Sequence, residues 1–193
     1  MNEKDDLLKY LRSQRANLLA KLEGLSDYDV RRPMTPTGTN LLGLLKHVAS
    51  VQLGYLGVVF DRPSNREMPW LAAGAPQDSD LWAGPDESRA DILELHEFSA
   101  LHSDRTIELL TLDTVGEVPW WDPASRQVTL SRIMVHVCVE TARHAGHADI
   151  LRELIDGATG NGPLDRNTST RTAEEWSAYR AELEAVASRH RLN

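Results

Sequence analysis

The residues most able to perform chemistry lie in one segment, SRIMVHVCVETARHAGHADILREL. His136, Glu140 and His144 follow one another there at four-residue intervals. In an α-helix this spacing places the three side chains on one face, about one turn apart. An imidazole and a carboxylate spaced in this way can converge on one metal ion. The segment therefore indicates either a metal site or an ordinary polar pair on a solvated helix face.

A further ligand candidate, His47, lies midway along the apolar segment LLGLLKHVASVQLGYLGVVF. A single histidine on an apolar helix face is more often a packed core residue than a ligand. In a helical bundle, however, a neighbouring helix can supply the ligand that another helix lacks. Taken together with Glu140 and His144, His47 favours a metal site shared by two helices.

The helices that must position these residues are predicted from apolar side chains recurring at three- and four-residue steps. Long irregular segments rich in proline and glycine separate them, above all residues 62–86. Thr39 or Asn40, and Asp86 or Ser88, are candidate N-caps, and Gly24 is a candidate helix stop. The predicted helices cover residues 3–23, 41–60, 88–112, 129–155 and 172–189, and residues 115–121 are a candidate extended segment. The predicted class is all-α, with a four-helix-bundle metal-binding domain over 1–160 and a linker and C-terminal helix, 161–193, packed on the same domain.

The segments RRPMTPTGTN, GLLKHVASVQ and ETARHAGHADILRE, in this order, resemble the DinB-like superfamily of metal-binding four-helix bundles. The similarity is strongest to its DUF664 branch, which includes the mini-circle proteins and is related to mycothiol-dependent maleylpyruvate isomerase. The resemblance covers most of the chain and implies that His47, Glu140 and His144 bind one divalent metal ion. It also places His136 and His147 beside the ligands rather than among them.

Two residues near these ligands have more than one interpretation. Asp149 could accept a hydrogen bond from His147 or His144, or brace the helix with Arg152. Gln52 stands where many relatives have a glutamate five residues after the histidine, which places activity in doubt if that carboxylate assists catalysis.

The chemistry of such a site depends on its open coordination positions. Two imidazoles and one carboxylate suit zinc, and would also accept nickel, iron or manganese. The site could activate a water or hold a thiolate. The resemblance implies thiol-dependent S-transfer or isomerisation on a small molecule, with a low-molecular-weight thiol as cosubstrate. Metal-assisted hydrolysis and a non-catalytic metal-binding stress or interaction bundle are the alternatives, and a closed coordination sphere completed by His147 would favour the latter.

Other side chains near the candidate ligands carry two interpretations each. Lys46 and Arg143 could bind charged groups of a cosubstrate or could be solvated surface charges. Trp120 and Trp121 could close over a pocket or fill a gap in the core. Cys138 lies between two valines and is interpreted as a buried, inert thiol.

Composition limits the partners and the compartment. With 21 Lys plus Arg against 29 Asp plus Glu, the formal net charge is −8, which disfavours nucleic acid. A single cysteine, a charged N-terminus and the expectation that no apolar run approaches a membrane span together predict a cytoplasmic protein. The resemblance to the DUF664 branch implies a bacterial source. A homodimer is expected by analogy.

Overall fold

Residues 2–160, 165 and 167–191 are described by the computed structural model. The chain divides into two units, Met1–Thr159 and Gly160–Asn193, each of which is considered by itself. The first unit contains five α-helices: α1 (Glu3–Ala20), α2 (Asp27–Arg31), α3 (Leu41–Tyr55), α4 (Arg89–Leu109) and α5 (Leu130–Asp156). It also has two 3₁₀ turns, η1 (Val58–Phe60) and η2 (Pro69–Leu71), and two short strands, β1 (Val115–Glu117) and β2 (Gln127–Thr129).

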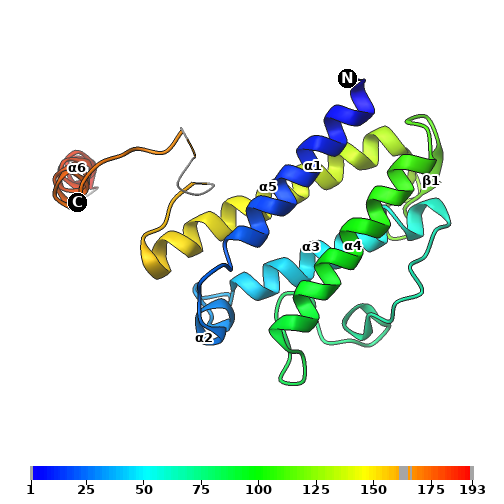
Figure 1. Ribbon diagram of the computed structural model, residues 1–193, viewed down its shortest axis with the longest axis horizontal. Helices are drawn as coiled ribbons and strands as arrows, with labels where there is room; N and C mark the ends of the chain where they lie inside the picture. The colour runs from blue at the N-terminus through cyan, green and yellow to red at the C-terminus, as the bar shows by residue number, and fades with distance from the viewer. Residues whose placement is uncertain (1, 161–164, 166, 192–193) are drawn as a thin grey trace. The chain divides into compact units, whose positions relative to one another are not determined.

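Four long helices form the bundle (Figure 1). α1 packs on α5, α5 on α3, α3 on α4, and α4 on α1, which closes the ring. Their buried faces carry leucine, isoleucine and valine, with Leu11, Leu18, Leu45, Ile107 and Ile133 wholly buried. The predicted all-α, DinB-like four-helix bundle with long loops is therefore confirmed.

The helices begin at the predicted polar caps. The Asn40 side chain accepts a hydrogen bond from the Gly43 amide, and Ser88 and Asp91 form a reciprocal capping box. Such caps satisfy amide groups that have no partner within the helix. Gly24 ends the first helical region with a φ of +73°, a conformation that costs glycine little.

Three local features differ from the sequence-based expectations. The helix predicted over 41–60 ends at Tyr55, and a 3₁₀ turn follows Gly57, because glycine weakens the helix there. The short helix α2 was not predicted, since five residues are too few to show a helical period. The extended segment is confirmed only over Val115–Glu117, and its antiparallel partner β2 was missed because it directly precedes α5.

One segment, Leu41–Phe60, is long and apolar enough to cross a membrane, which corrects the expectation that no run approaches this length. Of its most apolar window, 72% is buried inside the protein. Within the described residues, the apolarity of this segment thus serves the bundle core.

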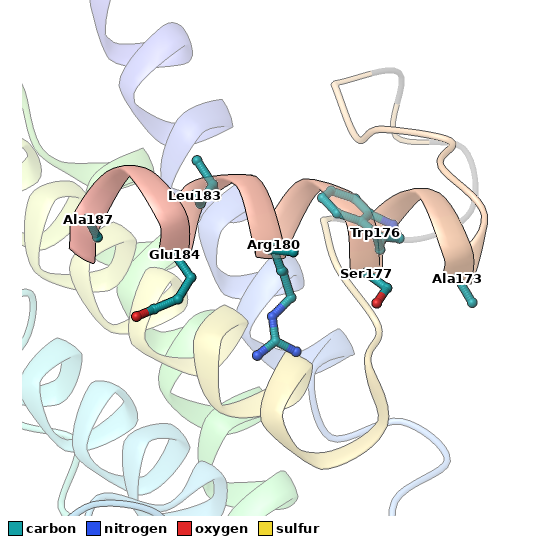
Figure 2. Close-up of a pocket in the computed structure, with 8 residues that line it drawn as sticks. Ala173, Trp176, Ser177, Arg180, Leu183, Glu184 and Ala187 are labelled. Carbon is teal, nitrogen blue, oxygen red and sulfur yellow. The ribbon is translucent and has the colours of Figure 1, made fainter. Parts of the chain in front are cut away.

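The second unit contains α6 (Ala173–Ser188), which begins with a capping box formed by Thr172 and Glu175. Figure 2 shows one face of this helix, where Trp176, Arg180, Leu183 and Glu184 border a shallow hollow. The Arg171 guanidinium lies over the rings of Trp176 and Tyr179, at 4.8 and 4.4 Å from their centroids. The packing of this helix on the first unit stays a prediction.

His96 on α4 gives the fold a measurable dependence on pH. Its side chain is 5% exposed, and its Nε2 has no hydrogen-bond partner among the described residues. Burial, together with the charge of Arg15, lowers the pKa of His96 to about 4. Because the unfolded chain binds this proton near pH 6.5, stability falls as the pH drops from 6.5 towards 4, by about 3 kcal/mol in total.

We expect His96→Leu to remove this contribution, so that the variant loses less stability than the parent between pH 7 and pH 4.5. Urea denaturation at the two pH values measures the difference. His190→Leu is the matched control, because His190 is exposed and its removal should leave the pH dependence unchanged. If the free energy of unfolding falls equally with pH in the parent and in His96→Leu, then His96 is not the source of this pH dependence.

Candidate metal centre

Three side chains from two helices converge between α3 and α5. One ligand atom from each of His47, Glu140 and His144 lies within 4.8 Å of the other two. Glu140 Oε1 is 3.4 Å from His47 Nε2 and 2.9 Å from His144 Nε2. Ligands about 2.0–2.1 Å from a tetrahedral ion are separated by about 3.4 Å, so these distances are close to those of a metal site. The residues therefore fit a divalent ion, and their spacing leaves further coordination positions to other groups.

The loop before α4 adds a carboxylate to this cluster. The Nδ1–H of His47 donates to Asp80 Oδ2 at 2.6 Å. This bond fixes the imidazole tautomer and leaves Nε2, which faces Glu140 Oε1, as the ring nitrogen that can act as a ligand, an arrangement typical of metal-binding histidines. Sequence reasoning missed Asp80, because it lies in the irregular 62–86 segment where no periodicity relates it to His47.

The carboxylates change the protonation of the two histidines. Burial by itself lowers the pKa of His47, but hydrogen bonds and charge from Asp80 and Glu140 raise it above its ordinary value. Burial and the nearby charge of His47 lower the pKa of His144. The hydrogen bond from His47 holds the pKa of Asp80 below its usual value, so Asp80 is ionised at neutral pH. Burial raises the pKa of Glu140, but hydrogen bonds and charge from His144 and His47 lower it overall, so the cluster holds two ionised carboxylates and attracts a cation.

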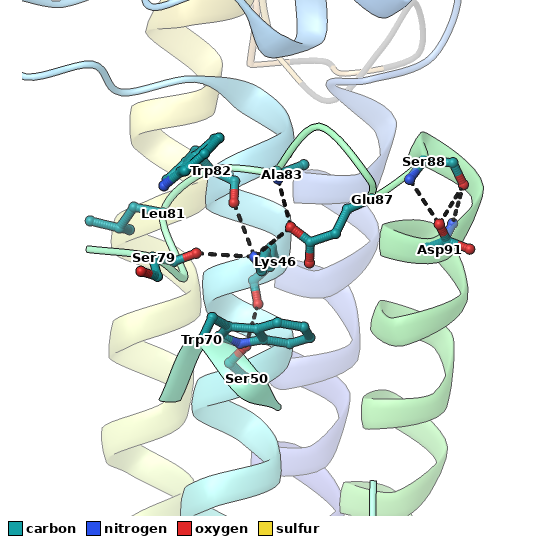
Figure 3. A network of polar contacts seen from close by, with 12 residues as sticks. Lys46, Ser50, Trp70, Ser79, Leu81, Trp82, Ala83, Glu87, Ser88 and Asp91 are labelled. Atoms are coloured by element: carbon teal, nitrogen blue, oxygen red, sulfur yellow. Dashed lines mark hydrogen bonds and ion pairs between the residues drawn. The ribbon is translucent and has the colours of Figure 1, made fainter. Parts of the chain in front are cut away.

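Lys46, next to His47, fastens the Asp80 loop to α3 (Figure 3). Its ammonium donates to the carbonyls of Ser79 and Trp82 and to Glu87 Oε2, at 3.0, 3.1 and 2.8 Å. It also lies 4.2 Å from the centroid of the Trp70 ring. Lys46 is only 2% exposed, so it is neither a solvated surface charge nor a group that reaches a cosubstrate.

The same loop comes into direct contact with the backbone of α3 at Gly43. A Cβ at this position would lie 1.8 Å from the Leu81 carbonyl oxygen. Only glycine permits that approach. The Asn40 amide then donates to the Leu81 carbonyl at 3.2 Å, which ties the loop to the start of the helix.

The other residues predicted near the ligands differ in what they contact. The His147 ring lies 5.3 Å from that of His144, and the His136 ring lies 4.6 Å from that of Tyr55. Asp149 pairs instead with Lys21 at 2.6 Å, and Arg152 pairs with Asp156 at 2.7 Å, so the proposed Asp149–Arg152 brace is wrong. The supporting roles of His136, His147 and Asp149 stay predictions.

Gln52 lies in the core rather than at the cluster. It is fully buried, and its side-chain oxygen accepts a hydrogen bond from the Arg15 guanidinium, which also pairs with Asp104. Gln52 is absent from the described residues that line the cavities beside the triad. The identity of the residue at this position therefore affects a buried network.

We accordingly expect Gln52→Glu to leave metal affinity within about twofold of the parent, because Gln52 bonds to Arg15 and Val48 rather than to a candidate ligand or a residue that orients one. Calorimetric titration of the variant and the parent with zinc measures the two affinities. Glu140→Gln serves as the contrasting variant, since it alters a ligand atom. A large gain in affinity from Gln52→Glu would show that this side chain reaches the site.

Two cavities lie beside the triad. The apolar pocket, about 750 Å³, includes His47 and Glu140, and the polar pocket, about 400 Å³, includes His144 and His147. The apolar pocket borders residues 47–55 of α3 and 136–140 of α5, whereas the polar pocket borders residues 40–44 and 144–147. The two pockets thus follow one another between antiparallel helices, with the triad where they meet. The apolar pocket is further lined by Val51, Tyr55, Val58, Met68, Leu71 and Trp120, together with Ser50, Asp80 and His136. The polar pocket is further lined by Thr37, Thr39, Asn40 and Asp78, together with Leu44, Leu81 and Trp82.

The adjacent tryptophans have different surroundings. Trp120 lines the apolar pocket, as one of the two interpretations expected, while Trp121 packs against a group of buried apolar residues that includes Leu56, Val118 and Leu130. Both indole N–H groups donate to the Tyr55 hydroxyl, at 3.2 and 2.9 Å. Cys138 is half-buried, and burial raises its pKa, which supports an inert thiol.

Comparisons with known proteins agree with this fold. A crystal structure of a conserved protein from Enterococcus faecalis has a TM-score of 0.59 at 15% identity, covering 82% of this chain and 99% of that one. That likeness shows the shared fold. A search of curated proteins found no match. A sequence model described as mycothiol-S-transferase matches residues 6–157, which span the bundle and all three candidate ligands. The chain therefore belongs to the mycothiol-S-transferase family, a branch of the DinB-like superfamily.

Proposed function

We propose that this protein is a divalent-metal-dependent S-transferase that joins a low-molecular-weight thiol, mycothiol, to a small electrophile. The observation that carries the proposal is the convergence of His47, Glu140 and His144 beside two cavities, in a chain of this family. Three protein ligands leave coordination positions for a substrate atom. We further propose zinc as the ion, with nickel, iron and manganese as the alternatives.

The ion would supply Lewis acidity, which lowers the pKa of a thiol and makes its thiolate available near neutral pH. The chain's own residues hold the ligands in place: Asp80 orients His47, and Lys46 holds the loop that carries Asp80. The polar pocket offers hydroxyl groups from Thr37 and Thr39 near His144. Such groups suit the hydrogen-bonding part of a thiol cosubstrate.

The test is turnover of 1-chloro-2,4-dinitrobenzene by the zinc-loaded protein with and without mycothiol. Conjugate formation that requires the protein, the thiol and the metal supports the proposal. Matched runs after removal of the metal with a chelator, and after its restoration, separate metal dependence from damage to the protein. Hydrolysis of an ester substrate without added thiol would favour the alternative, metal-assisted hydrolase.

A metal-loaded, folded protein with no activity towards any electrophile would favour a non-catalytic metal-binding role. The cytoplasmic location and the homodimer stay predictions from the sequence. Size-exclusion chromatography with light scattering measures the second of these directly.

A further inference from the structure

The apolar pocket has the composition of a binding site for a flat, apolar molecule. Aliphatic, aromatic and thioether side chains make up much of its lining. The polar side chains that line it are His47, Glu140, Asp80, Ser50 and His136, and the first two belong to the triad. Ligand pockets commonly combine apolar walls with a few polar groups at one end. A molecule bound here would therefore present one end to the triad and bury the rest against the walls.

Aromatic side chains in this pocket are held in fixed positions. The rings of Tyr55 and Trp120 meet edge to face, with centroids 5.2 Å apart and planes inclined by 74°. The hydrogen bond from the Trp120 indole to the Tyr55 hydroxyl fixes both rings. Even so, Trp120 remains 51% exposed, which leaves much of its surface available to a ligand. Offset or edge-to-face contact with a second aromatic ring would bury that surface favourably.

The charges around the pocket disfavour an anion. Neither lysine nor arginine occurs among the described residues that line it, whereas Asp80 and Glu140 do. These two carboxylates offset the two positive charges of a divalent ion, so the loaded site gains no net positive charge. An uncharged molecule loses the least hydration on entering such a pocket.

Resting on the proposed function, we propose that the apolar pocket binds the acceptor substrate, and that this acceptor is an uncharged, flat, aromatic electrophile. The thiol loses its proton to solvent, and the thiolate sulfur donates an electron pair to the electrophilic ring carbon. The halide or other leaving group departs with the electron pair of its bond to that carbon. The polar pocket, on the other side of the triad, then receives the thiol.

Two tryptophans of equal exposure make a matched test, since Trp82 borders the polar pocket and is 52% exposed while Trp120 is 51% exposed. The probe is 1,3-dinitrobenzene, an unreactive, uncharged ring, and its binding to the full metal-loaded chain is measured by equilibrium dialysis. We expect Trp120→Ala to raise its dissociation constant about tenfold. Trp82→Ala should leave the constant within about twofold.

A second pocket variant and a charged probe serve as further controls. Val51→Phe should weaken binding by filling the pocket, which covers the case in which Trp120→Ala misfolds. The anion 3,5-dinitrobenzoate should bind at least about tenfold more weakly than 1,3-dinitrobenzene. The inference is overturned if neither pocket variant weakens binding, if Trp82→Ala weakens it as much, or if the anion binds as well.

Binding of this probe needs neither a thiol nor turnover. A protein that binds it at Trp120 but catalyses no conjugation would keep the pocket assignment and refute the S-transferase proposal. Conjugation that is insensitive to Trp120→Ala and Val51→Phe would support the S-transferase proposal and refute the assignment of the acceptor to the apolar pocket.

Discussion

A His47→Ala/His144→Ala variant is expected to lose its metal while remaining folded. The purified parent should hold about one equivalent of a divalent ion, and the variant should bind it more than 100-fold more weakly, since even a residue supporting a ligand is worth about 10–100-fold. Of the three converging ligands, only Glu140 would remain. Both histidines are partly exposed, so their removal leaves the core clusters intact. Elemental analysis gives the metal content and circular dichroism the fold.

The matched control removes two histidines elsewhere, in His102→Ala/His190→Ala. His102 Nε2 lies 2.8 Å from the Arg62 carbonyl, and His190 belongs to the second unit. This control should keep the parent's metal content. A parent that binds none of zinc, nickel, iron or manganese, or equal metal contents in both double variants, would refute the metal site.

The second large effect is expected from Lys46→Met, which preserves much of the side-chain volume but removes the ammonium. The carbonyls of Ser79 and Trp82 and the Glu87 carboxylate would lose their shared donor. Loss of a buried charged partner destabilises proteins by several kcal/mol, and because Glu87 is partly exposed we expect about 3 kcal/mol here. The loosened loop would also hold Asp80 less firmly on His47, so metal affinity should fall about tenfold.

Arg143→Met is the control, because Arg143 likewise precedes a candidate ligand but is exposed. Urea denaturation and zinc titration of both variants measure stability and affinity separately. A stability loss without any change in affinity would show that the loop does not support His47. Equal effects from Arg143→Met would show that the charge near the site, rather than the buried network, is responsible.

The ligand pattern could be predicted from the sequence because helical geometry relates residues close along the chain. The four-residue spacing of Glu140 and His144 required only that the segment be helical, as α5 is. His47 could be named as a candidate because it lies on a strongly apolar helix that packs beside α5, and the resemblance to the DinB-like superfamily favoured it as a ligand. The caps Asn40 and Ser88 could be identified for the same reason, since each acts within three residues of itself.

Contacts made by irregular segments could not be predicted in this way. Asp80 reaches His47 across 33 residues of sequence, through a loop whose path depends on Gly43 and Lys46. No periodic pattern links these positions. Lys46 illustrates the same difficulty, because a lysine beside a ligand has the same sequence signature whether it is solvated or, as here, buried against carbonyl oxygens.

The candidate metal ligands and many of the residues that line the pockets belong to different kinds of structure. His47, Glu140 and His144 stand on packed helices, whereas Thr37, Met68, Leu71, Trp82 and Trp120 stand on connecting segments or 3₁₀ turns. Connecting segments tolerate substitution and insertion far better than core helices do. Under the proposed function, substitutions confined to these loops would change which acceptor is bound without altering the candidate metal centre.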